Sequence, residues 1–473
     1  MMWNFNQYPD NVAAMSDDGE RITYPQLQLA TERLLENITE RCLVFSICTN
    51  SIGSVVGYTG FVNHHIVPLL LSHHLDFELL QYLMETYKPS YLWLPVSMNE
   101  KFSEYTGFSS IYSDFNYTLV KTNFQDTYPL FEDLALLINT SGSTGSPKLV
   151  RQSYGNIEAN TQSIVEYLQL DETERPITTL PMNYVYGLSI VNTHLAVGAT
   201  LLLTDKSLME KGFWPFFKEQ QATSFGGVPY TYEMLDKLRF FRMGLTSLRT
   251  FTQAGGKLSP ELHKKFAEYA KETGKHFVVM YGAAEATSRM SYLPHEKSLE
   301  KYGSMGIAIP GGKFTLIDLA GNEITASDVT GELVYTGSNV TLGYAECGDD
   351  LIKSDEHFGQ LITGDMAKID KDGYYTIVGR KKRFLKIFGN RVNLDETERM
   401  IKTHFNHLDC ACAGVDDKMY IFITDQTISA EVRKFIAAKT SLNPVAFKVK
   451  VVDEVPKNES GKTLYTQLGQ YYD

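Results

Sequence analysis

The chain has 473 residues, of which 43% are hydrophobic, and carries a formal net charge of -12 at pH 7. Its length favours roughly two to four domains or subdomains. The negative charge argues against a general nucleic-acid binder, which needs a basic surface, and gives no support for binding to anionic membranes. Its first residues lack the pattern of a secretory signal, and no stretch approaches the roughly 20 apolar residues of a membrane span, so we expect a cytoplasmic protein without membrane insertion.

The five cysteines are too few and too scattered to indicate a disulfide framework. Cys410 and Cys412 alternate within 409–415, which predicts a strand with both thiols on one buried face rather than a metal site. The adjacent histidines at 64–65 and 73–74 point apart on any regular element, and no other ligand cluster accompanies them. We therefore expect structural or surface histidines.

The first part of the chain predicts alternating helices and strands. Apolar residues with helical spacing predict an amphipathic helix at 24–38, with Thr23 placed to cap it. Further strands are expected at 42–47, 91–94 and 134–138, and a further helix at 77–87. This pattern is typical of an α/β domain.

A loop of small residues follows the strand expected at 134–138. It consists of Thr140, Ser141, Gly142, Ser143, Thr144, Gly145, Ser146, Pro147 and Lys148. Glycines let main-chain N–H groups approach an anion, the hydroxyls add donors and Lys148 adds a positive charge, so the loop is suited to binding phosphate. Gly145 is separated from Lys148 by two residues, which excludes the Walker pattern. The same composition is also typical of an ordinary flexible connection.

The chain continues as α/β and then changes character. A strand at 200–203, a helix at 213–220 and a strand at 224–229 that enters a glycine-rich turn favour parallel sheets with helices outside. After about residue 307 we expect short strands at 313–318, 331–336 and 367–378, the last broken by a hairpin turn at 370–373. Beyond 380 the pattern predicts a small α+β domain, with helices at 395–403 and 429–438 and strands at 409–415, 419–424 and 446–452.

Four further motifs follow the loop in order. They are Tyr281-Gly282-Ala283-Ala284-Glu285, Gly331-Glu332-Leu333 running to Gly343-Tyr344, Thr363-Gly364-Asp365 with Gly379-Arg380, and Pro456-Lys457 running to Ser460-Gly461-Lys462. Together the five stretches, from about residue 24 to 462, resemble the adenylate-forming superfamily of acyl- and aryl-CoA synthetases, nonribosomal peptide synthetase adenylation domains and luciferase.

The resemblance implies an α/β fold with a large N-terminal domain at 1–380, built of parallel-rich sheets and a small β-barrel-like subdomain at about 307–380. A small mobile α+β lid domain at 381–473 would turn about a hinge at Lys382. The implied reaction has two steps. A small carboxylic acid attacks ATP to give an acyl-adenylate and pyrophosphate, with Mg²⁺ bound, and the thiol of CoA, or of the phosphopantetheine of a carrier protein, then takes the acyl group.

The resemblance also implies roles for single residues. The loop at 140–148 would bind the β- and γ-phosphates, Glu285 would bind Mg²⁺, and Tyr281 would pack on adenine with Gly282 and Ala283 beside it. Asp365 would accept hydrogen bonds from both ribose hydroxyls, Arg380 would reach ribose or phosphate, and Gly255, in a turn at 253–257, would lie beside adenine. Lys462 would enter the site during adenylation and contact the carboxylate and the α-phosphate.

Two positions depart from the family pattern, and the acyl pocket is less clearly marked. Ala284 replaces a threonine that binds the α-phosphate, although Thr287 lies nearby, and Leu149 replaces a glycine at the exit of the phosphate loop. The residues that match pocket-lining positions of the family are Tyr184, Gly187, Phe225, Gly226 and Ala284. Residues 181–187 contain no aspartate that would bind an ammonium group, so an α-amino acid is disfavoured.

Several functions therefore remain open at this point. The first is an AMP-forming CoA ligase for a small, aryl or medium-chain acid, and the second is a stand-alone enzyme that loads a carrier protein. A third enzyme would stop at the adenylate or pass it to another nucleophile. The departures at Ala284 and Leu149 leave a fourth, a non-catalytic protein that binds nucleotide or acyl ligand.

Overall fold

Two large sheets dominate the computed structural model, which describes residues 2–102, 107–139, 148–318, 320–381, 383–388, 390–405, 408–440, 442–457 and 463–472. The eight-stranded sheet has the order β19 (Gly343–Ala345), β9 (Leu149–Ser153), β8 (Leu134–Asn139), β4 (Val67–Ser72), β3 (Leu43–Cys48), β5 (Tyr91–Pro95), β7 (Tyr117–Lys121) and β6 (Ser109–Asp114). The nine-stranded sheet has the order β16 (Ile307–Ala308), β15 (Arg289–Tyr292), β14 (His276–Gly282), β13 (Thr250–Gln253), β12 (Ser224–Gly227), β10 (Pro176–Ile177), β11 (Leu201–Leu203), β1 (Val12–Ser16) and β2 (Arg21–Thr23). In both sheets the central strands are parallel and the edge strands antiparallel, as the prediction of parallel-rich sheets requires.

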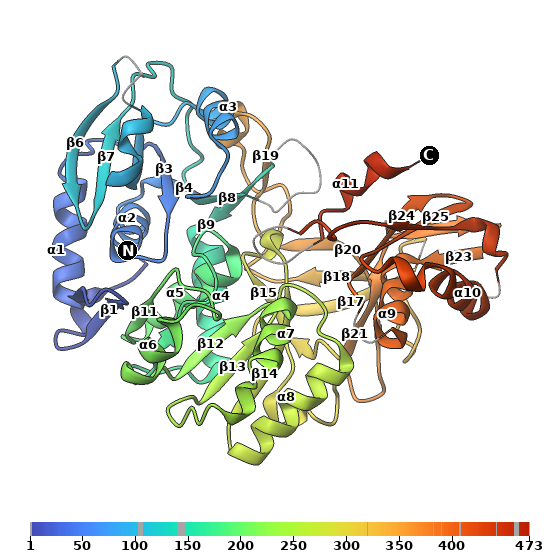
Figure 1. The fold of residues 1–473 in the computed structure, drawn as a ribbon. Coiled ribbons are helices and arrows are strands. Elements are labelled where there is room, and N and C mark those ends of the chain that lie inside the picture. The colour runs from blue at the N-terminus through green and yellow to red at the C-terminus, as the bar shows by residue number, and fades with distance from the viewer. Residues whose placement is uncertain are drawn as a thin grey trace.

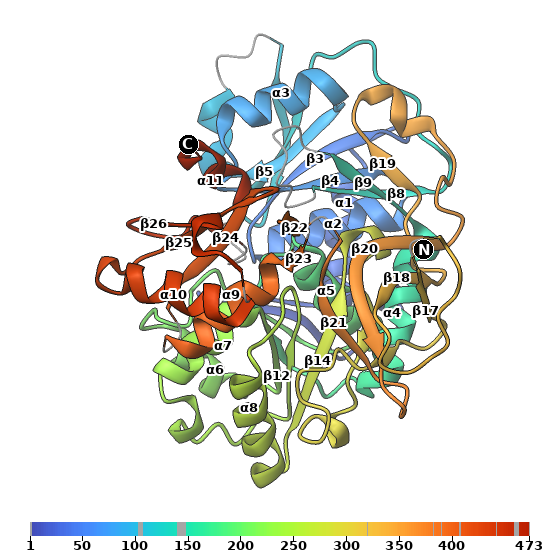
Figure 2. The ribbon, with the colours of Figure 1, turned by 90° about the vertical axis from the view of Figure 1, so that its right-hand side faces the viewer.

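Helices lie between the two sheets and on their outer faces. They are α1 (Tyr24–Leu35), α2 (Ile52–Asn63), α3 (Phe77–Tyr87), α4 (Tyr154–Leu168), α5 (Val185–Ala196), α6 (Phe213–Glu219), α7 (Pro229–Lys237) and α8 (Pro260–Thr273). Figures 1 and 2 show α3 at one end of the stack of layers, α6, α7 and α8 at the other, and α2 and α5 between the sheets. No helix in the described part of the chain is long and apolar enough to cross a bilayer.

Helix α1 shows how local sequence sets an element's limits. Thr23 caps it by accepting from the backbone N–H of Gln26, whose side chain accepts from the N–H of Thr23, as a capping box does. The helix ends at Leu35, three residues before the predicted limit. Asn37 donates its side-chain amide to the carbonyls of Arg33 and Leu34, and so satisfies backbone groups that the last turn leaves free.

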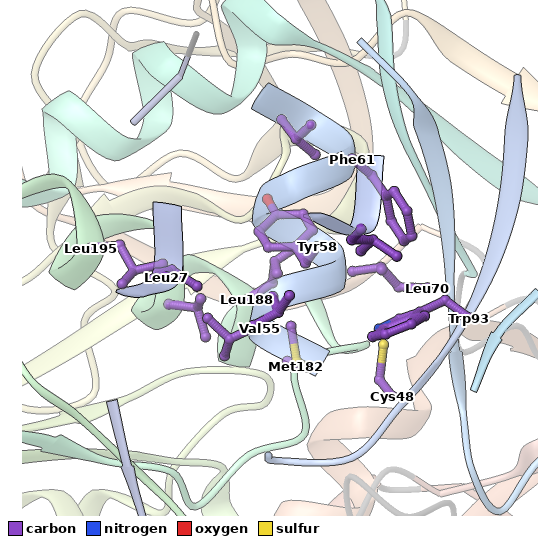
Figure 3. Packing of buried hydrophobic residues seen from close by; sticks show 14 of the residues in the cluster. Leu27, Cys48, Val55, Tyr58, Phe61, Leu70, Trp93, Met182, Leu188 and Leu195 are labelled. Atoms are coloured by element: carbon purple, nitrogen blue, oxygen red, sulfur yellow. The ribbon is translucent and has the colours of Figure 1, made fainter. Parts of the chain in front are cut away.

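Helix α2 is apolar on every side because it is surrounded. All twelve of its residues are buried. Figure 3 shows it between Leu27, Leu188 and Leu195 on one side and Leu70 and Trp93 on the other, residues contributed by α1, α5, β4 and β5. Trp93 donates its indole N–H to the carbonyl of Gly53 at 2.9 Å. This helix therefore joins the eight-stranded sheet to the helices that cover the nine-stranded sheet.

A four-stranded antiparallel sheet follows, in the order β17 (Lys313–Ile317), β18 (Gly331–Thr336), β20 (Gln360–Ile369) and β21 (Tyr375–Arg380). The predicted hairpin joins β20 to β21, but β20 begins seven residues before the expected start of its strand. The reason is that β18 pairs along it from Gln360 onward. The Thr363-Gly364-Asp365 motif is therefore in a strand, directly opposite Arg380.

The elements after residue 380 form a group of their own at the right of Figure 1. They are β22 (Phe384–Ile387), β23 (Asn390–Asn393), α9 (Leu394–His404), β24 (Cys410–Val415), β25 (Lys418–Ile423), α10 (Ser429–Thr440), β26 (Phe447–Val451) and α11 (Tyr465–Leu468). Cys410 and Cys412 lie in one buried cluster and are free thiols, which confirms the structural prediction for them. The exact boundary at residues 380 and 381 stays a prediction.

Arg383 organises this C-terminal group. Its guanidinium donates to Asp395 at 2.8 Å, to Glu398 at 2.5 Å and to the carbonyl of Cys412 at 2.7 Å, and it lies 3.7 Å from the ring centroid of Tyr465. Burial raises the pKa of the Glu398 carboxyl, and the charge of Arg383 opposes that effect. Arg383 thus connects α9, β24 and α11.

Replacing Gly57 on α2 tests the close packing between α2 and β5. A Cβ at this position would lie 2.3 Å from Cδ1 of the buried Trp93 ring. Helix propensity favours alanine by about 1 kcal/mol, whereas overpacking costs about 1–3 kcal/mol. We expect Gly57→Ala to lower the free energy of unfolding, measured by denaturant titration, by up to about 2 kcal/mol.

The matched control is Gly155→Ala in α4, where the nearest atom to an added Cβ is Ser153 Oγ at 3.8 Å. At this position alanine's higher helix propensity acts without a steric clash of the added Cβ, so the free energy of unfolding should stay equal or rise. Equal effects of the two substitutions would contradict the packing argument.

Candidate active site

Tyr281, Asp365 and Arg380 form one hydrogen-bonded group between β14 and the β20–β21 hairpin. The Tyr281 hydroxyl donates to Oδ2 of Asp365 at 2.5 Å, and Arg380 Nε lies 3.4 Å from Oδ1. Asp365 and Arg380 face each other because they are register partners on adjacent antiparallel strands. Three residues that the resemblance places around adenosine are therefore close together, although up to 99 positions separate them in the sequence.

Burial sets the ionisation of this group. It raises the pKa of the Asp365 carboxyl above its ordinary value, and the Tyr281 hydroxyl and Arg380 oppose that shift. Burial and the neighbouring carboxylate also raise the pKa of Tyr281, which keeps its hydroxyl protonated as a donor. Asp365 is thus a largely buried carboxylate, held by Tyr281 and Arg380, that gains from a ligand with hydroxyl donors.

A second group centres on Tyr344, on edge strand β19. Its hydroxyl donates to Oε1 of Glu285 at 2.7 Å, and Lys148 Nζ lies 5.7 Å from the centre of its ring. Lys148 also forms an ion pair with Glu346. The backbone N–H and hydroxyl of Thr341 both donate to the Glu285 carbonyl at 3.0 Å. Lys148 and Glu285 come from different sheets, and Tyr344 joins them.

Residues 281–285 connect the two groups, and their small side chains permit this path. A Cβ at Gly282 would lie 1.8 Å from the carbonyl oxygen of Ser288, so only glycine allows β14 and β15 to approach here. Ala283 and Ala284 follow, the second within the short 3₁₀ helix that carries Glu285.

The turn at 253–257 meets the predicted acyl pocket. Gly255 has a φ of +81°, and a Cβ there would lie 2.6 Å from the Tyr184 hydroxyl. Tyr186, two residues after Tyr184, forms a hydrogen bond with the Thr252 hydroxyl through its own hydroxyl, at 2.7 Å, and lies against Gly226. The structure therefore brings Tyr184, Gly226 and Gly255 together above one face of β12 and β13.

An apolar cluster lines this region, and we call it the acyl cluster. Its buried members are Leu180, Tyr186, Ile190, Val228, Ala254, Val278 and Met280, with Tyr167, Leu168, Tyr184 and Tyr292 packed against it.

Phe225 does not join the acyl cluster. Side chains alternate across a strand, so the neighbour of Gly226 points to the opposite face of β12. There Phe225 stacks on Phe251, with ring centroids 6.0 Å apart, in the core under α7 and α8. Gly187 has a packing role, because a Cβ there would lie 2.3 Å from the carbonyl oxygen of Pro181.

The structure also describes the two departures from the family pattern. Thr287 does not substitute for the missing threonine at 284, because its side chain is buried and its hydroxyl donates to the carbonyl of Asn339 at 2.7 Å. Leu149 is fully buried as the first residue of β9, where it pairs with Asn139 and Ala345. The predicted positions Thr140, Ser141, Gly142, Ser143, Thr144, Gly145, Lys382 and Lys462 lie outside the described residues.

Two side chains near the site were not singled out from the sequence. Tyr344 belongs to a quoted motif, but only the pairing of β19 with β9 places it beside Glu285 and Lys148. Arg289 lies four residues after Glu285, is the first residue of β15 and is buried. The sequence signal that could have identified Arg289 is a charged residue at a strand position that points into the protein.

The residues around Glu285 fit a magnesium ion bound together with phosphate. A carboxylate oxygen is the ligand type that Mg²⁺ prefers, and the ion usually takes only one or two protein carboxylates beside phosphate and water. Among the described residues there is no group of three or more His, Cys, Asp or Glu side chains that could hold a metal ion.

Residues 1–345 match the model of the family described as "AMP-binding enzyme". The chain belongs to the AMP-binding enzyme family. Peroxisomal OPC-8:0-CoA ligase 1 of Arabidopsis thaliana is 30% identical over 356 residues, which cover 71% of this chain and 64% of that protein. The long-chain-fatty-acid–CoA ligase of Salmonella typhimurium is 28% identical over 364 residues, covering 71% and 61%. The chain thus spans less than two thirds of the length of these relatives.

Solved structures of the family share the fold. The o-succinylbenzoate CoA synthetase of Bacillus subtilis, in complex with an acyl-adenylate intermediate, superposes with a TM-score of 0.80 at 20% identity, covering 98% of this chain and 97% of that one. ATP-bound MatB of Rhodopseudomonas palustris has a TM-score of 0.79 at 22% identity, covering 98% and 96%. The predicted α/β fold, with large N-terminal sheets and a small C-terminal domain, is confirmed.

The ionisation of Asp365 predicts a pH-dependent effect on stability. A pKa raised by folding means that the folded protein binds this proton more tightly than the unfolded chain, so the associated stability is lost as pH rises through the folded pKa. Asp365→Asn does not titrate. Its melting temperature without ligands should therefore rise relative to wild type as pH increases from about 4 to 7.

Asp318→Asn is a control of opposite sign, because hydrogen bonds from Asn322 lower the pKa of the Asp318 carboxyl. The Asp318 carboxyl titrates below about pH 4, so the melting temperature of Asp318→Asn should fall relative to wild type as pH rises from about 2 to 4 and stay level relative to wild type at higher pH. The same pH trend in both variants would refute the assignment.

Proposed function

We propose that this protein is an AMP-forming acid–thiol ligase that activates a small carboxylic acid as an acyl-adenylate and transfers the acyl group to CoA. The observation that carries the proposal is the convergence of Lys148, Glu285, Tyr281, Asp365 and Arg380 from three sheets on one region. These residues are the cations, carboxylates and aromatic ring that a nucleoside triphosphate requires. The relatives named above are CoA ligases, which favours CoA over a carrier protein as the acceptor.

The nucleotide's two ends would bind to the two groups. Asp365, already desolvated and held by Tyr281, accepts from the ribose hydroxyls, and Arg380 lies beside it to contact ribose or phosphate. Lys148, with the loop at 140–147, neutralises the β- and γ-phosphates in competition with Glu346. Glu285 and the phosphates would hold Mg²⁺, which supplies positive charge as the α-phosphate is attacked.

The chain's own residues then position the reaction. In adenylation, the carboxylate oxygen of the acid bonds to the α-phosphorus and the bond to pyrophosphate breaks, so negative charge moves toward the leaving group. Lys462 would stabilise the charge on the carboxylate and the α-phosphate. With alanine at 284 and Thr287 bonded to Asn339, Lys462 and Arg380 carry a larger share of that stabilisation than in relatives with a threonine.

Acid-dependent exchange of radioactive pyrophosphate into ATP tests the first step, because it needs no thiol acceptor. With Mg²⁺ and a panel of carboxylic acids, at least one acid should support exchange. Glu285→Gln should lower the exchange rate about 100-fold or more, since preorganised charge at such a site contributes on that order. Glu300→Gln removes an exposed carboxylate that pairs with Lys297 and should leave the rate unchanged. Nucleotide binding without exchange for every acid would contradict the proposal and favour a non-catalytic protein.

The two steps should separate at Lys462. Lys462→Ala should abolish pyrophosphate exchange far more than it slows thioester formation from a supplied acyl-adenylate, because its charge acts on the first transition state. Lys439→Ala, an exposed lysine on α10, is the control and should affect neither step. Equal loss of both half-reactions would contradict this role.

Thioester formation is then measured in parallel with CoA and with a phosphopantetheine-bearing carrier protein, which identifies the acceptor. If the thioester forms only on the carrier protein, the carrier protein replaces CoA as the proposed acceptor.

A further inference from the structure

Arg289, on β15, is a buried cation with few partners. Its exposed fraction is 2%. Nη1 donates to the hydroxyl of Tyr167 at 3.2 Å and lies 3.3 Å from the sulfur of Met280, which is a weak acceptor. Nε is buried and has no hydrogen-bond partner among the residues that the structure describes. The guanidinium carbon lies 5.0 Å from the ring centroid of Tyr186.

Other buried arginines of this chain show what such a charge normally needs. Arg151 pairs with Glu356 at 2.5 Å and donates to the carbonyls of Leu342 and Tyr344. Arg383 pairs with two carboxylates. For Arg289, the described ranges contain no carboxylate within ion-pair distance. An uncompensated buried charge is costly, so a protein that retains one usually has a use for it.

The position of Arg289 indicates that use. Two of the side chains on its guanidinium, Tyr186 and Met280, are members of the acyl cluster, and Tyr167 packs against the same cluster. Tyr186 also lies against Gly226, at the surface of β12. Arg289 therefore lies at the wall of the region predicted to receive the acyl group, on the strand that follows Glu285.

We propose that Arg289 binds a second carboxylate at the far end of the substrate, so that the acids activated by this protein are dicarboxylic acids. The inference rests on the proposed function and specifies its substrate class. A planar guanidinium with free N–H donors matches a carboxylate in a bidentate arrangement. The Met280 side chain is flexible and its sulfur is a weak acceptor, so the ligand can replace its contact with Arg289. Tyr167 keeps the guanidinium oriented and can turn its hydroxyl toward the anion.

The same charge explains selectivity against other acids. An ammonium group beside Arg289 would meet a like charge in a dry environment, which agrees with the absence of an aspartate from 181–187. A methyl-ended acid would bury an apolar end against an unpaired cation. A neutral acceptor would satisfy the N–H donors, and an anionic end would satisfy both the donors and the charge.

Matched pairs of acids test the inference on the wild-type protein. Pyrophosphate exchange is measured with succinate and butyrate, glutarate and valerate, and adipate and hexanoate, which differ within each pair only in the terminal group. We expect the dicarboxylic acid of at least one pair to have a kcat/KM about 10- to 100-fold above its partner, the range for hydrogen bonds to a charged group. Preference for the monocarboxylic acid in every pair would overturn the inference but not the proposed function, whereas no exchange with any acid would overturn both.

Substitution then assigns the preference to Arg289. Arg289→Met should lower kcat/KM for the preferred dicarboxylic acid by about 10- to 100-fold and leave the value for its monocarboxylic partner equal or higher. Arg249→Met, which removes an exposed arginine paired with Glu174, should leave the ratio unchanged. Calorimetric titration with ATP reports whether each variant still binds nucleotide.

An unchanged ratio in Arg289→Met would overturn the inference. Should that variant fail to fold, Arg289→Lys keeps the charge but loses the bidentate geometry. It should reduce the preference for the dicarboxylic acid, and an undiminished preference would again contradict the assignment.

Discussion

The hydrogen bond between Tyr344 and Glu285 joins the two large sheets at the candidate site. Tyr344 lies on the edge strand of the eight-stranded sheet, and Glu285 follows a strand of the nine-stranded sheet. Away from this contact, α2 is buried on all sides and packs in one core cluster with residues of both layers. Glycine at 53 and 57 allows that packing, since side chains there would meet Tyr117 and Trp93. The two large sheets are thus joined both by a polar contact at the site and by apolar packing away from it.

The buried charged side chains of this protein differ in how fully other groups compensate their charge. Arg151 and Arg383 are compensated by carboxylates and carbonyls, and both hold separate segments together. Asp365 is held by Tyr281 and Arg380 but its pKa is raised by burial, and Arg289 has a buried Nε without a partner among the described residues; under the two proposals above, both would contact a ligand. Incomplete compensation costs stability in the free protein, and a ligand that binds only the folded state would restore it. This contrast distinguishes structural ion pairs from candidate binding groups without reference to relatives.

Prediction from the sequence succeeded where the signal is local. The Thr23 capping box, the periodicity at 77–87 and the alternation at Cys410 and Cys412 depend on neighbouring residues, and the elements match closely. It was less accurate where partners are distant. The start of β20 depends on its pairing with β18. The direction of the Phe225 side chain depends on which face of β12 carries the acyl cluster. Neither property is encoded within a short window.

The sequence by itself determined the α/β class, the order of the motifs and the kinds of chemical group available, because these follow from composition, spacing and periodicity. Only the tertiary structure decided which groups meet. It placed Tyr344 between Lys148 and Glu285, paired Asp365 with Arg380, bonded Thr287 to Asn339 and, among the residues that the structure describes, left Arg289 Nε without a partner. The physical reason is that contacts between distant segments are set by strand register and layer packing, which act on the whole chain at once.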